Sequence, residues 1–165
     1  MAHYRLIIIT VLLAVLCALT ISRSSVYEDE VSLFSDVAAK SPNKARAHNN
    51  LGDALNKAHR PEEARPHFER ALELQPNYPD ALNNLATVYN GMGRRPEALD
   101  LYVRALALNP GHLQARFNLA FVYYEQGMLS EAEQHFAILM SIAPESKEGV
   151  FARKMLSLIR NRRPS

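Results

Sequence analysis

Beyond residue 44, apolar and small residues return along the chain with a period of 34 positions. Six positions carry similar residues in three successive periods, and in the first period they are Leu51, Gly52, Leu55, Ala64, Phe68 and Pro76. Their counterparts are Leu85, Ala86, Tyr89, Ala98, Tyr102 and Pro110, and then Leu119, Ala120, Tyr123, Ala132, Phe136 and Pro144. A period of this length indicates a stack of similar supersecondary units.

Each period predicts two helices joined by a tight turn, because its apolar positions lie three or four residues apart. We expect the first helix at about residues 45–57, 79–91 and 113–126. Gly93 and Gly127 occupy the end of a first helix, where a left-handed residue is favoured, and His59 should be slightly strained in that place. A helix-starting residue opens each second helix, namely Pro61, Pro96 and Ser130.

This pattern resembles the tetratricopeptide repeat (TPR) family over residues 45–146. The resemblance implies three helix-turn-helix repeats, at 45–78, 79–112 and 113–146, and therefore an all-α solenoid. The sequence departs from the family pattern in two ways. Leu139 stands where the first two repeats have Ala71 and Ala105. The family's frequent tryptophan is replaced by His48, Leu82 and Arg116.

The segments on either side of the repeats follow the same register. Residues 26–44 predict half a repeat, because the alanine, aromatic, small-residue and proline positions of a second helix hold Glu30, Phe34, Val37 and Pro42. Residues 147–165 predict a C-terminal capping helix with a basic tail, since such arrays need a polar outer cap. Its expected packing face holds Val150, Phe151, Met155, Leu158 and Ile159.

The N-terminal segment, residues 1–25, contains the apolar run Leu6 to Ile21 between Arg5 and Arg23. As a helix, residues 4–22 would be about 28 Å long, close to the thickness of a bilayer core. We expect an uncleaved transmembrane helix, with the N-terminus cytoplasmic and the repeats extracytoplasmic. The alternative is a cleaved signal and a secreted protein, although no Ala-x-Ala motif precedes a cut.

Composition narrows the possible functions. The net charge of +2 gives no basis for a nucleic-acid interface, and a single cysteine excludes a disulfide framework or a multi-cysteine zinc site. No two of the six histidines have the i, i+4 spacing of a helical zinc site. The chain is therefore expected to be no enzyme and to need no cofactor or metal.

Binding chemistry is expected on the first helices, which line the concave face of a TPR solenoid. Asn50, Asn84 and Asn118 recur there every 34 residues, and each amide can serve an extended peptide backbone as donor and acceptor. This column resembles the asparagine ladder in the TPR superhelix of O-linked N-acetylglucosamine transferases. The alternative is that these amides bond locally or to water.

Further groove residues lie beside this column. They are expected to be polar in the first two repeats and aromatic in the third: Asn49, Asn83, Asp53 and Thr87, and then Phe117, Phe121 and Tyr124. The aromatic side chains would either form a pocket for a partner's side chain or pack under the capping helix. Without a lysine at Asn49 or Asn83, the groove does not resemble TPR domains that clamp a chaperone's terminal carboxylate.

The sequence thus favours a membrane-anchored, non-enzymatic scaffold that binds a protein or peptide partner, and self-association stays open. A weaker resemblance suggests an alternative. Residues 32–52 are similar to the membrane-to-TPR junction of polytopic proteins related to protein O-mannosyltransferases. The chain would then be an accessory subunit of an envelope glycosylation or polysaccharide-assembly complex.

Overall fold

The computed structural model describes residues 9, 11–13, 15–16 and 28–162, and within them the regular structure is entirely α-helical. A helix covers residues 28–40 (helix 28–40 below). It is followed by α2 (Ala45–Lys57), α3 (Pro61–Leu74), α4 (Pro79–Gly91), α5 (Arg95–Leu108), α6 (Leu113–Glu125), α7 (Leu129–Ile142) and α8 (Lys147–Arg162). The predicted all-α solenoid is therefore confirmed.

The predicted membrane segment falls mostly outside this description. Of residues 4–22, only 9, 11–13 and 15–16 are described, and they are helical. Among the described residues, no helix combines the length and the apolar character that crossing a membrane requires.

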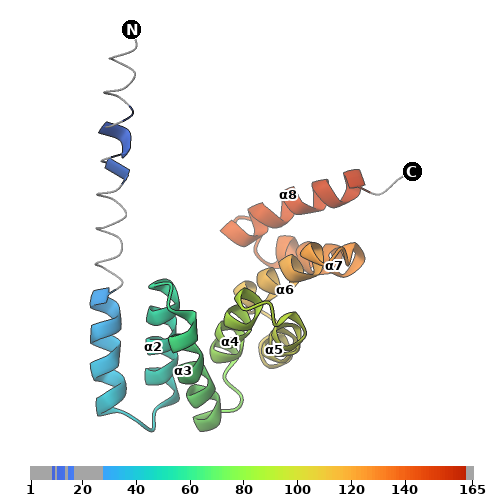
Figure 1. The fold of residues 1–165 in the computed structure, drawn as a ribbon. Coiled ribbons are helices and arrows are strands. Elements are labelled where there is room, and N and C mark those ends of the chain that lie inside the picture. Colours follow the sequence, from blue (N-terminus) through green and yellow to red (C-terminus); the bar gives the residue numbers. More distant parts are fainter. Residues whose placement is uncertain (1–8, 10, 14, 17–27, 163–165) are drawn as a thin grey trace.

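Three helical hairpins form the array: α2 with α3, α4 with α5, and α6 with α7 (Figure 1). Helix 28–40 lies at one end of the array and α8 at the other (Figure 1). The first helices of successive hairpins contact one another, α2 with α4 and α4 with α6, whereas α3 and α5 do not. The array therefore curves toward its first helices, which form the concave side.

The core of each hairpin is an aromatic side chain of the second helix facing a small residue of the first. Phe68 and Phe136 are fully buried and Tyr102 is 1% exposed. A Cβ atom added to Gly52 would lie 2.7 Å from the Phe68 ring, so the two helices approach closely at this point. Close packing at this column explains why the position after each repeated leucine is small.

All three first helices end in the same hydrogen-bonded turn. In the first repeat, the amide of His59 donates to Asn56 O and that of Arg60 to Leu55 O. Gly93 and Gly127 close the other two helices with the same pair of bonds. The closing residue has a positive φ in each case, 62° at His59, 77° at Gly93 and 76° at Gly127. The expected left-handed conformation of His59 is thus observed.

At the contact between paired helices, one pair of facing positions holds different residue types in each repeat. In the first repeat, His48 Nδ1 and His67 Nδ1 are 3.4 Å apart, and the rings are stacked. Arg116 and His135 take these two places in the third repeat, with 3.5 Å between Nη1 and Nδ1. Leu82 and Leu101 fill them in the second repeat and are buried.

The packing face of α8 differs from the predicted one. Met155 and Ile159 are buried as expected and Phe151 is half-buried, but Val150 and Leu158 are 50% and 40% exposed. Ala152 and Leu156 complete the buried stripe instead. Val150 and Leu158 lie on the opposite side of this helix, because α8 docks mainly on α7.

Replacing His59 with glycine should stabilise the array by about 1 kcal/mol, because glycine adopts a positive φ without steric cost. The expected rise in melting temperature is roughly 3 °C for a domain of this size. His59→Ala is the matched control, since it removes the imidazole and keeps the backbone strain. Equal melting temperatures for the glycine and alanine variants, measured by circular dichroism, would refute this explanation.

Thermal stability should decrease as the pH falls below about 6.5, the ordinary pKa of histidine. Burial, with the neighbouring His48, lowers the pKa of His67, although Glu63 opposes this. Burial, with Arg116, also lowers the pKa of His135. Because the folded state disfavours protonation, their stabilising contribution is complete above the unfolded pKa and is lost as the pH falls through the folded pKa.

The double substitution His48→Leu with His67→Leu tests this, since it copies the Leu82 and Leu101 pair of the second repeat. Melting temperature should depend less on pH in this variant than in the wild-type chain between about pH 5 and 7, above the ordinary range of carboxylates. Parallel curves for the two proteins would contradict the assignment to His67.

Candidate functional site

The asparagines on the concave side form a hydrogen-bonded network that links successive repeats. Asn84 Nδ2 donates to Asn49 Oδ1 at 3.1 Å, and Asn118 Nδ2 donates to Asn83 Oδ1 at 3.0 Å. Asn83 Nδ2 in turn donates to Asn84 Oδ1 at 3.2 Å. Asn49 and Asn83 are 6% and 5% exposed, so they support the network from within, while Asn84 and Asn118 are half-buried at its surface.

Thr87 connects the network to the buried core of the second hairpin. Its hydroxyl lies 3.1 Å from the Tyr102 hydroxyl and accepts from Asn118 Nδ2 at 3.3 Å. Burial raises the pKa of Tyr102 to about 12, against the effect of its hydrogen bonds to Thr87 and Asn118. The phenol therefore stays neutral, and the aromatic core of the second repeat is tied to the amides of the concave side.

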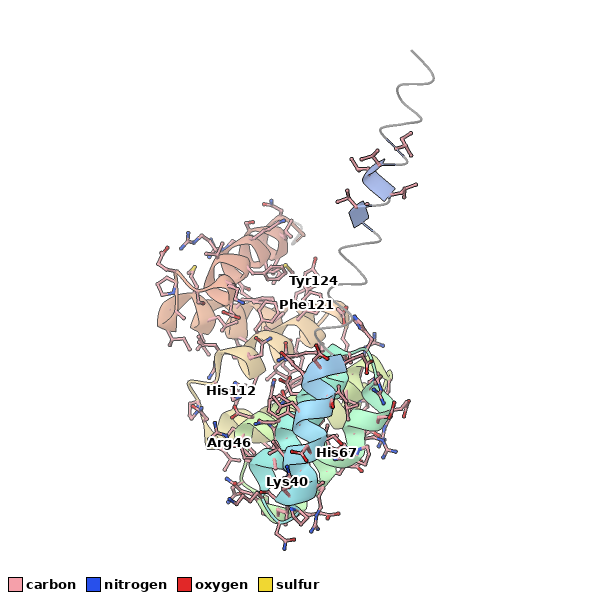
Figure 2. All side chains as sticks on the ribbon, turned by 90° about the vertical axis from the view of Figure 1, so that its left-hand side faces the viewer. Lys40, Arg46, His67, His112, Phe121 and Tyr124 are labelled. Carbon is pink, nitrogen blue, oxygen red and sulfur yellow. The ribbon has the colours of Figure 1, made fainter. Side chains whose placement is uncertain are left out.

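A pocket of about 550 Å³ opens over this network. Its lining comes from α2, α4, α6 and the turns before them: Arg46, Asn49, Asn50, Asp53, Tyr78, Asp80, Asn83, Asn84, His112 and Gln114. Arg46 and His112 mark this side of the array in Figure 2. The structure thus gathers most of the predicted polar residues of the first two repeats around one cavity.

The charges at the pocket are partly neutralised by neighbouring groups. Asp53 pairs with Lys57 at 2.8 Å between carboxylate and ammonium, and His112 Nε2 lies 3.1 Å from Asp80 Oδ1. His112 Nδ1 accepts the amide of Ala115 at the start of α6, so Nε2 carries the proton and donates to Asp80. Burial and then Asp80 raise the pKa of Tyr78, with Arg46 acting in the opposite direction.

The aromatic residues of α6 lie apart from this pocket and pack against α8. The ring centroid of Phe117 is 5.1 Å from that of Phe151, in an edge-on arrangement. The ring centroid of Phe121 is 6.4 Å from that of Phe151, and Tyr124 packs against the core beneath α8. All three side chains are half-buried, and Figure 2 labels Phe121 and Tyr124. They pack with the capping helix and leave part of each ring exposed.

Several pocket residues were not predicted from the sequence. Tyr78 and His112 precede the first helices, and Asp80 and Gln114 lie in their first turns. These residues form two further columns with the period of 34, and Lys44 and Arg46 are the first-repeat members. The period could have revealed them, but their residue types differ between repeats, so no shared chemistry drew attention to them.

A second and larger hollow, of about 850 Å³, lies on the other side, between α3, α4 and α5. Its charged rim is already paired: Glu69 with Arg65 and Tyr89, Arg94 with Glu97, and Asp100 with Arg104. Arg94 also covers the Tyr89 ring at 4.1 Å. The described residues that line it include no asparagine or glutamine, and its charges are paired within the array. This hollow is therefore a weaker candidate for binding a peptide backbone than the pocket on the concave side.

The profile of the tetratricopeptide repeat family matches residues 26–77, 43–110 and 77–145. The chain therefore belongs to the TPR family, whose members generally act as non-catalytic modules for protein interaction. A search of curated proteins found no match.

Solved structures show the same fold. A crystal structure of MamA is 21% identical, with a TM-score of 0.72 over 82% of this chain and 77% of that one. YrrB, a TPR protein with an unusual peptide-binding site, is 23% identical, with a TM-score of 0.67 over 79% and 67%. The first TPR of Spaghetti, bound to the HSP90 peptide SRMEEVD, is 21% identical, with a TM-score of 0.66 over 72% and 91%.

Proposed function

We propose that the concave pocket binds an extended peptide segment of a partner protein, with Asn50 and Asn84 as the principal contacts to its backbone. The supporting observation is the unused hydrogen-bonding capacity of the Asn84 amide at the pocket. Asn84 donates one of its two N–H groups to Asn49 and accepts one bond from Asn83. It retains one donor and one acceptor site for a ligand. Asn50 also lines the pocket.

Asn118 contributes differently, because the array already uses its donors. Its Nδ2 bonds to Asn83 Oδ1 and to Thr87 Oγ1, and its Oδ1 accepts from Gln114 at 3.1 Å. Only acceptor capacity remains for a peptide N–H group. The sequence predicted a ladder of three equivalent amides. We propose instead that Asn50 and Asn84 each donate to and accept from the peptide backbone, and that Asn118 only accepts from it.

The proposed ligand is an extended segment of low net charge. Two carboxylates, Asp53 and Asp80, and one guanidinium, Arg46, line the pocket, and both carboxylates are paired with neighbours. Amide hydrogen bonds therefore dominate over long-range attraction. At the third repeat, the half-buried rings of Phe117, Phe121 and Tyr124 supply an apolar edge for one side chain of the partner.

The proposal predicts unequal losses of affinity in the Asn84 and Asn118 variants. A peptide selected from a random library on the full-length chain would serve as the probe. Asn84→Ala should weaken its binding by roughly 5- to 10-fold, the effect of one or two hydrogen bonds, and Asn118→Ala should weaken it less. Isothermal titration calorimetry measures both changes.

Gln134→Ala on α7 is the matched control, since it removes an exposed amide from a second helix. Its affinity should equal that of the wild-type chain. Unchanged affinity in Asn50→Ala and Asn84→Ala would rule out the proposed backbone contacts. Circular dichroism must show the same helix content in all variants, because Asn84 also links two repeats.

We further propose that residues 4–22 anchor the array to a membrane, with the repeats on the extracytoplasmic side. This rests on the apolar run between Arg5 and Arg23. External protease should degrade the repeats on intact spheroplasts, and an antibody against residues 1–4 should react only after lysis. Protection of the repeats in intact spheroplasts would reverse the orientation, and an N-terminus that begins after residue 22 would indicate a cleaved signal.

The accessory-subunit alternative gains no support from the fold. Residues 32–52 form the rest of helix 28–40, the following turn and the start of α2. Because these residues belong to the repeat fold, their similarity to a membrane-to-TPR junction does not point to a glycosylation partner in particular.

A further inference from the structure

The two ends of the array are complementary halves of one repeat. Helix 28–40 ends at Lys40, which is 34 residues before the end of α3 at Leu74. It therefore has the register of a second helix. α8 begins at Lys147, which is 34 residues after the start of α6 at Leu113, so it has the register of a first helix. Within the described part of the chain, no second helix follows α8.

Each end exposes an aliphatic side chain in the column where paired helices touch. Leu33 is in register with His67, Leu101 and His135, and Val150 is in register with His48, Leu82 and Arg116. Within complete repeats, members of these two columns contact each other, as the 3.4 Å separation of His48 and His67 shows. At the ends of the array, Leu33 is 58% exposed and Val150 is 50% exposed.

The two ends also carry opposite charges at the neighbouring column. Glu30 replaces the fully buried Ala64, Ala98 and Ala132 of the second helices, and Lys154 replaces Gly52, Ala86 and Ala120 of the first helices. Further charges of the same sign are exposed on the same helices, Asp29 and Asp36 on helix 28–40 and Arg153 and Arg160 on α8. Of these, Asp36 pairs with Lys40 and Arg153 with Glu145. One end is therefore acidic and the other basic, each around an unpacked aliphatic residue.

We propose that copies of this chain associate head to tail, with α8 of one copy packing against helix 28–40 of the next. The two helices would form a composite fourth repeat in which Val150 meets Leu33 and Lys154 meets Glu30. The spacing fits an antiparallel pair, because a step of four residues along α8 meets a step of three residues back along helix 28–40.

The binding partner of each end is expected to be a second copy of this chain. Helix 28–40 has the register of a second helix and acidic residues, and α8 has the register of a first helix and basic residues. The interface joins two different surfaces, so it leaves a free end on each copy and extends into a chain or closes into a ring. It lies outside the concave pocket and does not depend on peptide binding.

Sedimentation equilibrium of the full-length chain in mild detergent tests the proposal. The average mass of the wild-type protein should rise with protein concentration. Glu30→Lys and Lys154→Glu should each weaken association at least about tenfold, because like charges then face each other across the interface. An equimolar mixture of the two variants, and the double variant Glu30→Lys with Lys154→Glu, should both regain association.

Arg104→Glu is the matched control, because it reverses an exposed charge on α5 in the middle of the array. It should associate like the wild-type chain. A wild-type mass that stays at one chain at every concentration would overturn the proposal. So would undiminished association of either single variant, or a mixture that stays dissociated while both variants show the wild-type circular dichroism spectrum.

Discussion

The structure depends on one contact that is made once in each repeat, between a buried aromatic ring of the second helix and a small residue of the first. Phe68 faces Gly52 so closely that a Cβ atom there would collide with the ring. Tyr102 and Phe136 are equally buried opposite Ala86 and Ala120. Because a single hairpin cannot cover both of its apolar faces, stacking is needed to complete the core, and the 34-residue period follows from this requirement.

Stacking brings polar residues together as well as apolar ones. The first helices contact each other along the concave side, so amides that are 35 residues apart in sequence become hydrogen-bonded neighbours, as Asn84 and Asn49 do. Part of the hydrogen-bonding capacity on this side therefore stabilises the array, and only the remainder can serve a ligand. In the proposed function, the same residues would both hold the curvature of the solenoid and contact the peptide, so binding would depend on the rigidity of the groove.

The fold was predictable from the sequence because its determinants are local and repeated. Each determinant acts within one hairpin: the leucine and small-residue columns, the prolines, and the turn position that holds His59, Gly93 and Gly127. Each of these positions occurs three times in the sequence, once in every repeat. Even the left-handed conformation of His59 followed from its register with Gly93 and Gly127. The pocket was less predictable, because Tyr78, Asp80 and His112 come from variable columns and are brought together only by the packing of neighbouring repeats.

The sequence by itself determined the repeat, its helix boundaries and the positions that point toward the concave side, since helical periodicity sets which side of a helix a residue occupies. The tertiary structure decided how those positions are used. It showed that both N–H groups of Asn118 donate hydrogen bonds within the array and that the Phe117 ring packs edge-on against Phe151. It also showed that α8 turns Val150 outward instead of burying it. These outcomes depend on how one helix docks on the next, and no single period of the sequence contains that information.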